Sequence, residues 1–325
     1  MLGTDSSKFV SVNVAFADLR KRPVDRLKGI GEKDLLQESQ CLYGEVLEVV
    51  EEWKDWLHVS SLSQVKRSDQ QIWKGYPGWI KKFQVCSIPE EIRGRVLFVT
   101  VPWASIRFFQ EKGGEKKIYL PLGARLLAKR IEKKLWKFQM LGGYGLVSTK
   151  EVKEEKDLLN LSETKKRKGI VDIARCFLGN PYFWGGRATY HSQIAPSTSV
   201  DCSSLVNLSY LSQALYVPRN AHDQFLFCKC LSPLNLQEGD LIFLAKQSLP
   251  NFIEHVMIYE GKGFLLEATE DSKSVCRRSL EDRLGFLLKD LKEGDLVKGG
   301  KLVYFGSFLH SKNLLKKKEI GIIET

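Results

Sequence analysis

Residues 201–211 read DCSSLVNLSYL, a cysteine between an aspartate and two serines that leads into an apolar run. The apolar residues recur at helical spacing, so the pattern predicts a helix that begins at Cys202. Free N–H groups and the macrodipole at a helix N-terminus favour the thiolate, the reactive form of cysteine, and can also hold an oxyanion. This context leaves two interpretations of Cys202 open, a nucleophile or a small buried hydrophobic residue.

A cysteine nucleophile needs a base, and the sequence offers five histidines. His58 lies in a predicted strand, His310 in the polar C-terminal tail, and His191 in a loop-like stretch rich in Ser, Thr and Pro. His255 opens a predicted strand over residues 255–259, where its ring can emerge from a buried strand. His222, just after the Cys202 helix, stays a competitor.

The composition indicates a multidomain protein without a nucleic-acid function. With 325 residues and 43% hydrophobic content, the chain predicts two or three domains. The net charge of +11 is concentrated in the runs 165–168 and 316–318, which are typical of solvated linkers or tails. No nucleic-acid-binding motif accompanies these runs. An anionic polymer such as the cell wall suits the charge equally well.

The N-terminal segment and the cysteines indicate where the protein is located and whether it binds a metal. Residues 1–17 lack the basic and apolar regions of a secretory signal, so a cytoplasmic location is predicted, with export by another route left open. No apolar run is long enough to span a membrane. Seven cysteines, an odd number, favour reduced thiols. Cys228 and Cys230 lack a second Cys/His pair nearby, and neither a metal nor an organic cofactor is predicted.

The front half predicts small β-domains. Short strands over 44–50, 56–59 and 78–80 are separated by Gly- and Pro-containing turns, which indicates a β-barrel or sandwich. The segments LYGEVLEVVEE, WLHV and YPGWI resemble a bacterial SH3-like domain. The stretch 95–147 repeats the same rhythm and predicts a second such domain. The charged stretch 151–168 predicts an exposed connecting segment.

Beyond this segment, an apolar helical pattern over 170–178 ends at Gly179-Asn180-Pro181, and a glycine-rich turn, the Cys202 helix and strands follow. This order predicts an α+β domain. Residues 165–306 resemble the NlpC-type peptidase domain, a reduced papain-like fold. The resemblance is carried by six motifs in order: PYFWGG (181–186), DCSSLV (201–206), VPRNAHDQ (217–224), LQEGDLIFL (236–244), HVMIYEG (255–261) and KLVYFG (301–306).

The expected fold is therefore an α+β papain-like (NlpC-type) catalytic domain preceded by two small all-β SH3-like barrels. The expected boundaries are 1–90 for the first SH3-like domain with an N-terminal extension, 91–150 for the second, 151–310 for the peptidase domain and 311–325 for a basic tail.

The resemblance implies a cysteine peptidase with Cys202 as nucleophile and His255 as base. In the family a third polar residue, commonly histidine, orients the base; here that position holds Glu267, whose carboxylate can perform the same role. The whole chain resembles γ-D-glutamyl-L-diamino-acid endopeptidases, which cleave murein peptides. Murein peptides or peptidoglycan are therefore the expected partners, and the oligomeric state is left open.

The resemblance also implies substrate contacts. Tyr182 is expected to line the cleft, with packing against Trp184 as the alternative. Asp201 and Ser203 are expected to contact the free amino end of the substrate, although Asp201 could equally cap the Cys202 helix. Tyr76 of the first SH3-like domain is expected to cover the pocket for an N-terminal alanine, with support of the barrel core as the alternative.

The sequence departs from the family at two places near these residues. Ser204 replaces the usual glycine, and the stretch 187–200 is long enough to form a loop over the cleft. Two other functions remain open. One is an amidase or acyltransferase of the papain-like group, and the other is a non-catalytic adaptor that binds the cell wall.

Overall fold

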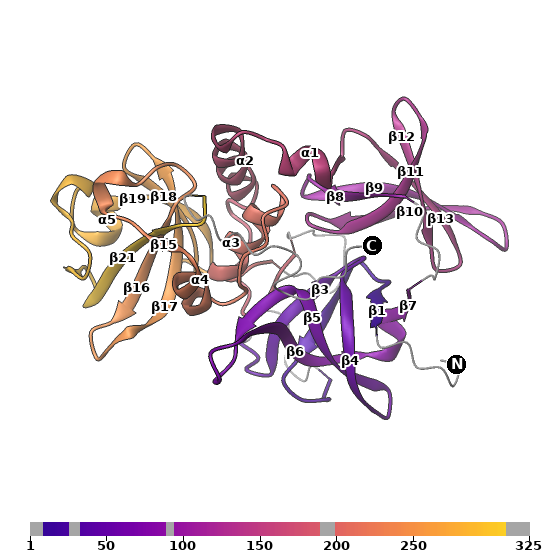
Figure 1. Ribbon diagram of the computed structural model, residues 1–325, viewed down its shortest axis with the longest axis horizontal. Helices are drawn as coiled ribbons and strands as arrows, with labels where there is room; N and C mark the ends of the chain where they lie inside the picture. Colours follow the sequence, from indigo (N-terminus) through magenta and orange to yellow (C-terminus); the bar gives the residue numbers. More distant parts are fainter. Residues whose placement is uncertain (1–8, 26–32, 89–93, 189–198, 310–325) are drawn as a thin grey trace.

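The computed structural model describes residues 9–25, 33–88, 94–188 and 199–309. They form two antiparallel β-modules followed by an α+β domain (Figure 1). Most of the predicted loop over the cleft, the basic tail, His191 and His310 lie outside the described residues.

The first module is a seven-stranded antiparallel sheet with the order β3-β2-β6-β5-β4-β1-β7. Its elements are β1 (Phe9–Val12), β2 (Phe16–Arg20), β3 (Gln37–Leu42), β4 (Val46–Trp53), β5 (Trp56–Arg67), β6 (Trp73–Lys81), the short 3-10 helix η1 (Lys82–Gln84) and β7 (Val85–Ser87). The predicted strands 56–59 and 78–80 fall within β5 and β6, and the predicted strand 44–50 overlaps β4, which begins at Val46. Alternating apolar residues such as Leu47, Leu57 and Ile80 face a common core.

The second module is also a seven-stranded antiparallel sheet, with the order β10-β9-β13-β12-β11-β8-β14. This is the order of the first module with seven added to each strand number. Its strands are β8 (Arg95–Val99), β9 (Trp103–Gln110), β10 (Glu115–Pro121), β11 (Arg125–Glu132), β12 (Leu135–Met140), β13 (Gly143–Ser148) and β14 (Val152–Glu154). Leu97, Ile106 and Trp136 belong to its separate core. Both modules are thus antiparallel sheets of one topology, and their closure as SH3-like barrels stays a prediction.

The third part combines helices with a sheet of order β15-β21-β16-β17-β18-β19, in which β20 pairs with β21. Its elements are α1 (Glu155–Leu159), α2 (Glu163–Cys176), α3 (Cys202–Leu211), α4 (Ala221–Phe227), β15 (Lys229–Cys230), η2 (Pro233–Asn235), β16 (Leu241–Lys246), β17 (Leu249–Gly261), β18 (Phe264–Thr269), β19 (Ser274–Ser279), α5 (Leu280–Leu284), η3 (Leu288–Asp290), β20 (Leu296–Val297) and β21 (Lys301–Ser307). One core lies between the sheet and the helices, and a second covers the opposite face.

The charged stretch 151–168 is only in part the exposed connection that the sequence predicts. It forms β14, α1 and the start of α2, so that α2 begins seven residues before the predicted helix and ends at Cys176. Arg167 is buried and bonds to the Asp240 carboxylate at 2.8 Å. The prediction was wrong for Arg167, because a charged side chain can be buried when it finds a partner of opposite charge far along the chain.

The strand that carries His255 is also longer than predicted. It begins at Leu249 rather than at His255, and it pairs with β16 through register shifts near Leu244 and Ala245. These irregularities allow the polar hairpin of residues 246–254 to continue the strand beyond the buried part of the sheet. His255 therefore lies inside β17, where the strand enters the core.

The two β-modules pack against the α+β domain rather than extending freely from it. Leu42 of the first module and Phe98 and Leu122 of the second belong to the same buried cluster as α3. A side chain at Gly123 would contact Leu208 and Leu211 of α3. The front modules consequently reach the helix on which Cys202 lies.

Candidate active site

Cys202 is the first residue of α3, as predicted, and is partly buried. Asp201 is the N-cap: its carboxylate accepts a hydrogen bond from the Ser204 backbone N–H at 2.8 Å. In return, the Ser204 hydroxyl accepts a bond from the Asp201 N–H at 2.9 Å, which completes a capping box. Ser204, the residue in place of the family's glycine, therefore fixes the helix start that presents the thiol.

His255 lies between Cys202 and Glu267, the two other residues of the predicted triad. The Cys202 side chain lies close enough to the His255 side chain to raise the pKa of its imidazole. On the other side of the ring, Nε2 lies 2.7 Å from the Glu267 carboxylate in β18. The carboxylate thus fixes the ring orientation and leaves Nδ1 for the thiol. The side chain of His255 is 16% exposed, which leaves the ring open to a substrate.

Glu267 is fully buried and is held by more cations than the sequence predicts. The Arg283 side chain of α5 donates to both carboxylate oxygens at 2.9 and 3.1 Å, and Arg278 of β19 lies 3.4 Å away. Although burial acts in the opposite direction, the hydrogen bond from His255 and the charge of Arg283 lower the pKa of Glu267. Glu267 is therefore a carboxylate at neutral pH.

The pKa of His255 is shifted in the opposite direction. Burial lowers it, but the hydrogen bonds to Cys202 and Glu267 raise the pKa to about 9. A raised pKa means that the imidazolium survives at neutral pH beside the thiol. A buried carboxylate thus stabilises the positively charged form of the ring that lies beside the thiol.

His222, the competing base, occupies a different place. Its Nδ1 accepts a bond from the Ile253 backbone N–H at 3.4 Å, and its ring stacks on Phe252 at 4.7 Å between centroids. Burial and the charge of Arg67 lower its pKa. His222 therefore binds the outer part of β17, while His255 contacts the cysteine.

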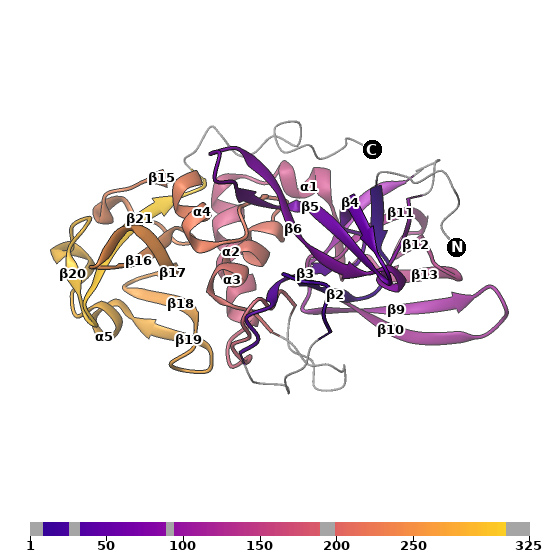
Figure 2. The same cartoon turned by 90° about the horizontal axis from the view of Figure 1, so that it is seen from below.

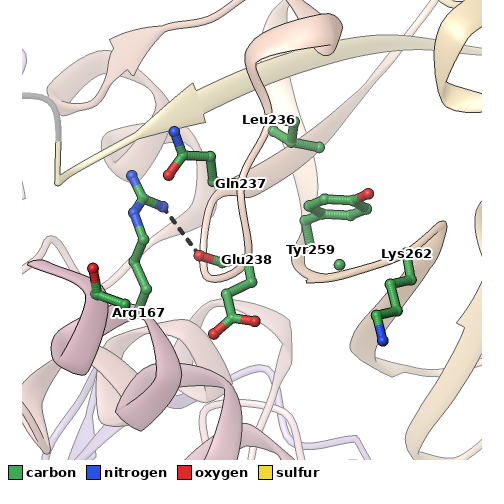
Figure 3. A pocket seen from close by; sticks show the side chains of 8 residues that line it. Arg167, Leu236, Gln237, Glu238, Tyr259 and Lys262 are labelled. Atoms are coloured by element: carbon green, nitrogen blue, oxygen red, sulfur yellow. Dashed lines mark hydrogen bonds between the residues drawn. The ribbon is translucent and has the colours of Figure 1, made fainter.

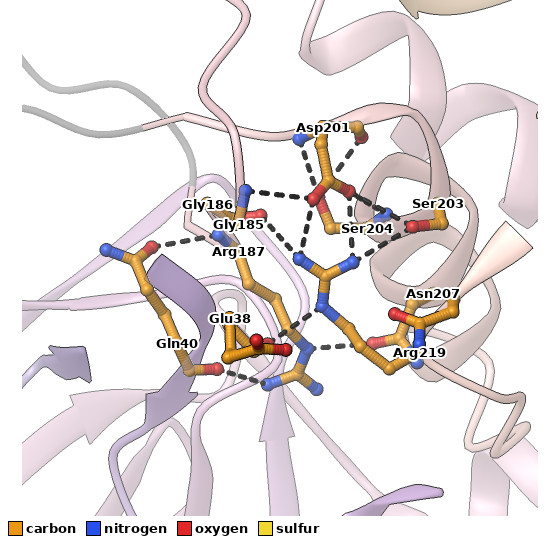
Figure 4. A network of polar contacts seen from close by, with 12 residues as sticks. Glu38, Gln40, Gly185, Gly186, Arg187, Asp201, Ser203, Ser204, Asn207 and Arg219 are labelled. Atoms are coloured by element: carbon orange, nitrogen blue, oxygen red, sulfur yellow. Dashed lines mark hydrogen bonds and ion pairs between the residues drawn. The ribbon is translucent and has the colours of Figure 1, made fainter. Parts of the chain in front are cut away.

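A buried arginine joins the residues that flank the nucleophile (Figure 4). Arg219 donates to both oxygens of Asp201 at 3.0 and 2.8 Å and to the Ser203 hydroxyl at 2.9 Å. Its Nε donates to Ser39 of β3 at 2.8 Å. Asp201 is 7% exposed and its carboxylate is engaged by the helix cap and by Arg219. The capping alternative for Asp201 is therefore realised, and a contact with substrate stays a prediction.

The Arg219→Ala variant is expected to be less stable by about 3–5 kcal/mol, because it leaves the buried Asp201 carboxylate without its cation. Thermal unfolding followed by circular dichroism measures the loss. Arg107→Ala is the matched control, since Arg107 pairs with Glu115 at an exposed site and such pairs contribute about 0–1 kcal/mol. Equal losses in the two variants would contradict the structural role of Arg219.

Tyr76 extends from β6 of the first module to the edge of this network. Its hydroxyl donates to the Glu38 carboxylate at 2.9 Å and lies 3.3 Å from the amide oxygen of Asn220, the neighbour of Arg219. Tyr76 is 3% exposed, whereas Glu38 is partly exposed. The structure therefore places Tyr76 between the module core and the site, and it adds a carboxylate that the sequence did not indicate.

Tyr182 lies beside the nucleophile. Burial and the nearby Cys202 and Asp201 raise its pKa, so its hydroxyl stays protonated and can donate. Trp184 is exposed and carries the Lys33 ammonium over its ring at 4.2 Å. At Gly185 the backbone has φ +70° and its N–H donates to Asp201 at 3.1 Å, so a side chain there would strain the turn.

A hollow of about 410 Å³ lies away from this site, between α2 and the loop that precedes β16 (Figure 3). Its lining includes Arg167, Glu238, Tyr259 and Lys262 but no cysteine or histidine. The Arg167 guanidinium is already bonded to Asp240 and to the Glu238 carbonyl oxygen. This hollow thus offers no nucleophile and base like those at Cys202.

Residues 179–285 match the family model described as the NlpC/P60 family. The chain is 28% identical to a γ-D-glutamyl-L-lysine dipeptidyl-peptidase of Bacillus subtilis, over 79% of this chain and 80% of that protein. A protein of the same name from Bacillus cereus is 24% identical over 73% of this chain and 69% of its own length. The chain is therefore an NlpC/P60 domain protein, and this domain is that of a cysteine peptidase family.

A solved NlpC/P60 family protein from Bacillus cereus shares the fold. It aligns with a TM-score of 0.70 at 22% identity and covers 84% of this chain and 94% of its own. The likeness thus includes the front modules as well as the NlpC/P60 domain. The predicted α+β papain-like class is confirmed for the rear domain.

The described residues of this NlpC/P60 protein include every cysteine of the chain. All seven cysteines are free thiols, Cys228 and Cys230 included. In the described ranges, no group of three or more His, Cys, Asp and Glu side chains is arranged to hold a metal ion. Nor does a helix in those ranges have the length and apolar character needed to cross a bilayer.

Sequence reasoning missed Arg219, Glu38 and Arg283. Arg219 stands within the VPRNAHDQ motif that carries the family resemblance, so its position was visible although its bond to Asp201 was not. Glu38 and Arg283 have no local signal, because each acts through a partner on another element, Tyr76 or Glu267.

Proposed function

We propose that this protein is an endopeptidase that hydrolyses the γ-D-glutamyl–diamino-acid bond of murein peptides, with preference for peptides that have a free N-terminal L-alanine. One observation carries the proposal: the front module reaches the Cys202–His255–Glu267 site. Arg219 donates to Asp201, the neighbour of Cys202. Asn220, the residue after Arg219, lies beside the Tyr76 hydroxyl, which donates to Glu38. The names of the Bacillus relatives support this choice of bond.

The reaction follows from the geometry. The Cys202 thiolate attacks the γ-glutamyl carbonyl carbon, and amides at the start of α3 stabilise the oxyanion, with the Tyr182 hydroxyl as a further donor. The His255 imidazolium then protonates the leaving amine. His255 next accepts a proton from water, which attacks the thioester and releases Cys202. Throughout, Glu267 holds the ring and stabilises its charge.

The front module supplies specificity in this proposal. A substrate ammonium needs a carboxylate in reach, and Glu38 is partly exposed while Asp201 is bound to Arg219. Tyr76 and Glu38 therefore form the contact for the free amino end, and Ser203 adds a hydroxyl. We further propose that both β-modules are SH3-like and that the first excludes intact, glycan-linked stems. The cytoplasmic location stays a prediction.

Digestion of defined peptides tests this function. The peptide L-Ala-γ-D-Glu-L-Lys and its N-acetylated form are incubated with the protein, and mass spectrometry identifies the products. We expect release of lysine from the free peptide, and at least about a tenfold lower kcat/KM for the acetylated peptide, because the Glu38 carboxylate would lose its ammonium partner.

The product pattern also distinguishes the alternatives. Cleavage at another amide would indicate an amidase, and transfer to an added amine without hydrolysis would indicate an acyltransferase. Binding without turnover, together with an unreactive Cys202 thiol, would indicate a wall-binding adaptor. Equal rates for the free and acetylated peptides would contradict the role of Glu38 and Tyr76 while leaving the bond assignment intact.

A further inference from the structure

Four cationic side chains form a row across the outer side of the second module. Lys117 of β10 lies opposite Arg107 of β9, and Lys129 of β11 lies opposite Lys137 of β12. Leu146 of the intervening strand β13 lies opposite both Arg107 and Lys137, and so connects the two pairs. Residues directly opposite each other point to the same face of a sheet, so these side chains share one face. The row is about 19 Å long at the usual strand spacing of about 4.8 Å.

We call Lys117, Arg107, Lys137 and Lys129 the basic face. All four side chains are exposed, whereas their neighbours along the strands, such as Ile106, Phe138 and Ala128, are buried in the core. The five strands contribute two carboxylates. Glu115 pairs with Arg107 at 2.7 Å, and Glu132 lies at the end of β11. The basic face therefore keeps a net positive charge.

The first module shows that this topology does not require such a row. Its strands have the same order, and the corresponding paired positions are Gln37, Arg20, Trp79, His58 and Glu51. There Arg20 is 2% exposed and bonded to Asp34, and His58 lies 3.8 Å from Glu51. The accumulation of exposed cations is thus particular to the second module.

The basic face also opposes the stability of its own sheet. Lys117 stands directly opposite Arg107, and Lys129 directly opposite Lys137. Like charges in directly opposed positions destabilise an antiparallel pair. A polyanion on this face would remove that repulsion, since each phosphate can lie between neighbouring cations.

Aromatic rings next to the row restrict the kind of polyanion. Phe109 and Tyr144 stack on each other at 5.0 Å with an angle of 11°, and the Lys137 ammonium lies 3.8 Å from the centre of the Tyr144 ring. Lys117 similarly lies over Tyr119. Binding of single-stranded nucleic acid relies on free ring faces for base stacking, and these rings are already covered. A polymer of phosphates without bases fits the face better.

We propose that the basic face binds a linear phosphodiester polymer of the bacterial cell wall. The choice of a wall polymer rests on the proposed function. β9 and β10 extend to one end of the molecule, whereas α3, which begins at Cys202, lies in its middle (Figure 2). A polymer bound at that end can therefore leave the nucleophile accessible. In an exported protein, a possibility that the sequence leaves open, the face would hold the peptidase near anionic wall material while short peptides reach Cys202.

Binding of the full-length protein to poly(glycerol phosphate), measured by isothermal titration calorimetry at several salt concentrations, tests this proposal. The double variant Lys129→Gln/Lys137→Gln is expected to bind at least about tenfold more weakly near 0.15 M salt and to show a smaller salt dependence. Lys289→Gln/Lys292→Gln on the rear domain removes the same charge from exposed sites and is the matched control.

Oligothymidylate and the free tripeptide separate the remaining outcomes. Tighter binding of oligothymidylate than of the glycerol phosphate polymer, no binding of the polymer, or equal losses in both double variants would each overturn the proposal. The double variants are expected to cleave L-Ala-γ-D-Glu-L-Lys at the wild-type rate. If the wild type binds the polymer but cleaves no peptide, the proposed function fails while the basic face stands.

Discussion

The Cys202→Ala variant is expected to lose cleavage of L-Ala-γ-D-Glu-L-Lys by about 10⁴-fold or more in kcat, because removal of a nucleophile leaves only binding and oxyanion stabilisation. The Asp201–Ser204 capping box and the Arg219 bonds do not use the sulfur atom. The helix should therefore keep its structure, and the thermal unfolding midpoint should change little. Single-turnover assays with product detection by mass spectrometry measure the loss.

Cys176 offers a matched control. It is an exposed free thiol on α2, and its sulfur donates to the Asp172 backbone carbonyl oxygen at 3.3 Å. Cys176→Ala is expected to cleave the peptide at the wild-type rate. Iodoacetamide should inactivate the wild type and the Cys176→Ala variant equally. Residual turnover by Cys202→Ala above one part in about a thousand would show that another group performs the attack.

The sequence was informative where one local pattern determines a local structure. The apolar periodicity after Cys202 predicted α3 and placed the cysteine at its start, because helix beginnings depend on a few adjacent residues. The strand alternation around Trp56 and Gly78 likewise predicted β5 and β6. Glu267 was assigned through a resemblance, and its contact with His255 appeared only in the structure.

Charged residues were harder to place, because their burial depends on partners far along the chain. Arg167 lies in a basic run that looks solvated, yet Asp240, 73 residues later, pairs with it in the interior. Arg187 is fully buried and bonds to Glu45 of the first module at 2.6 Å. Such ion pairs hold the front module against the rear domain, and no periodic pattern in the sequence announces them.

The Glu267→Gln variant is expected to lower kcat by about 10²–10⁴-fold, since an amide keeps the shape but cannot stabilise the imidazolium. It should also change the pH profile. The proposed active state contains protonated His255, which exists below the pKa of about 9. Without the carboxylate, Arg283 and Arg278 remain beside the ring and disfavour its positive charge. The basic limb of kcat/KM should therefore move to lower pH by at least about one unit.

Two further variants show whether this shift comes from the charge of Glu267. Glu281→Gln, an exposed change on α5, should leave the profile unchanged. Arg283→Met removes the cation but keeps the carboxylate, so the pKa of His255 should rise and the basic limb should move to higher pH. The two shifts have opposite signs because Glu267 stabilises the imidazolium and Arg283 opposes it. A profile that stays fixed in Glu267→Gln, or shifts in the same direction in both variants, would show that the carboxylate does not control the base.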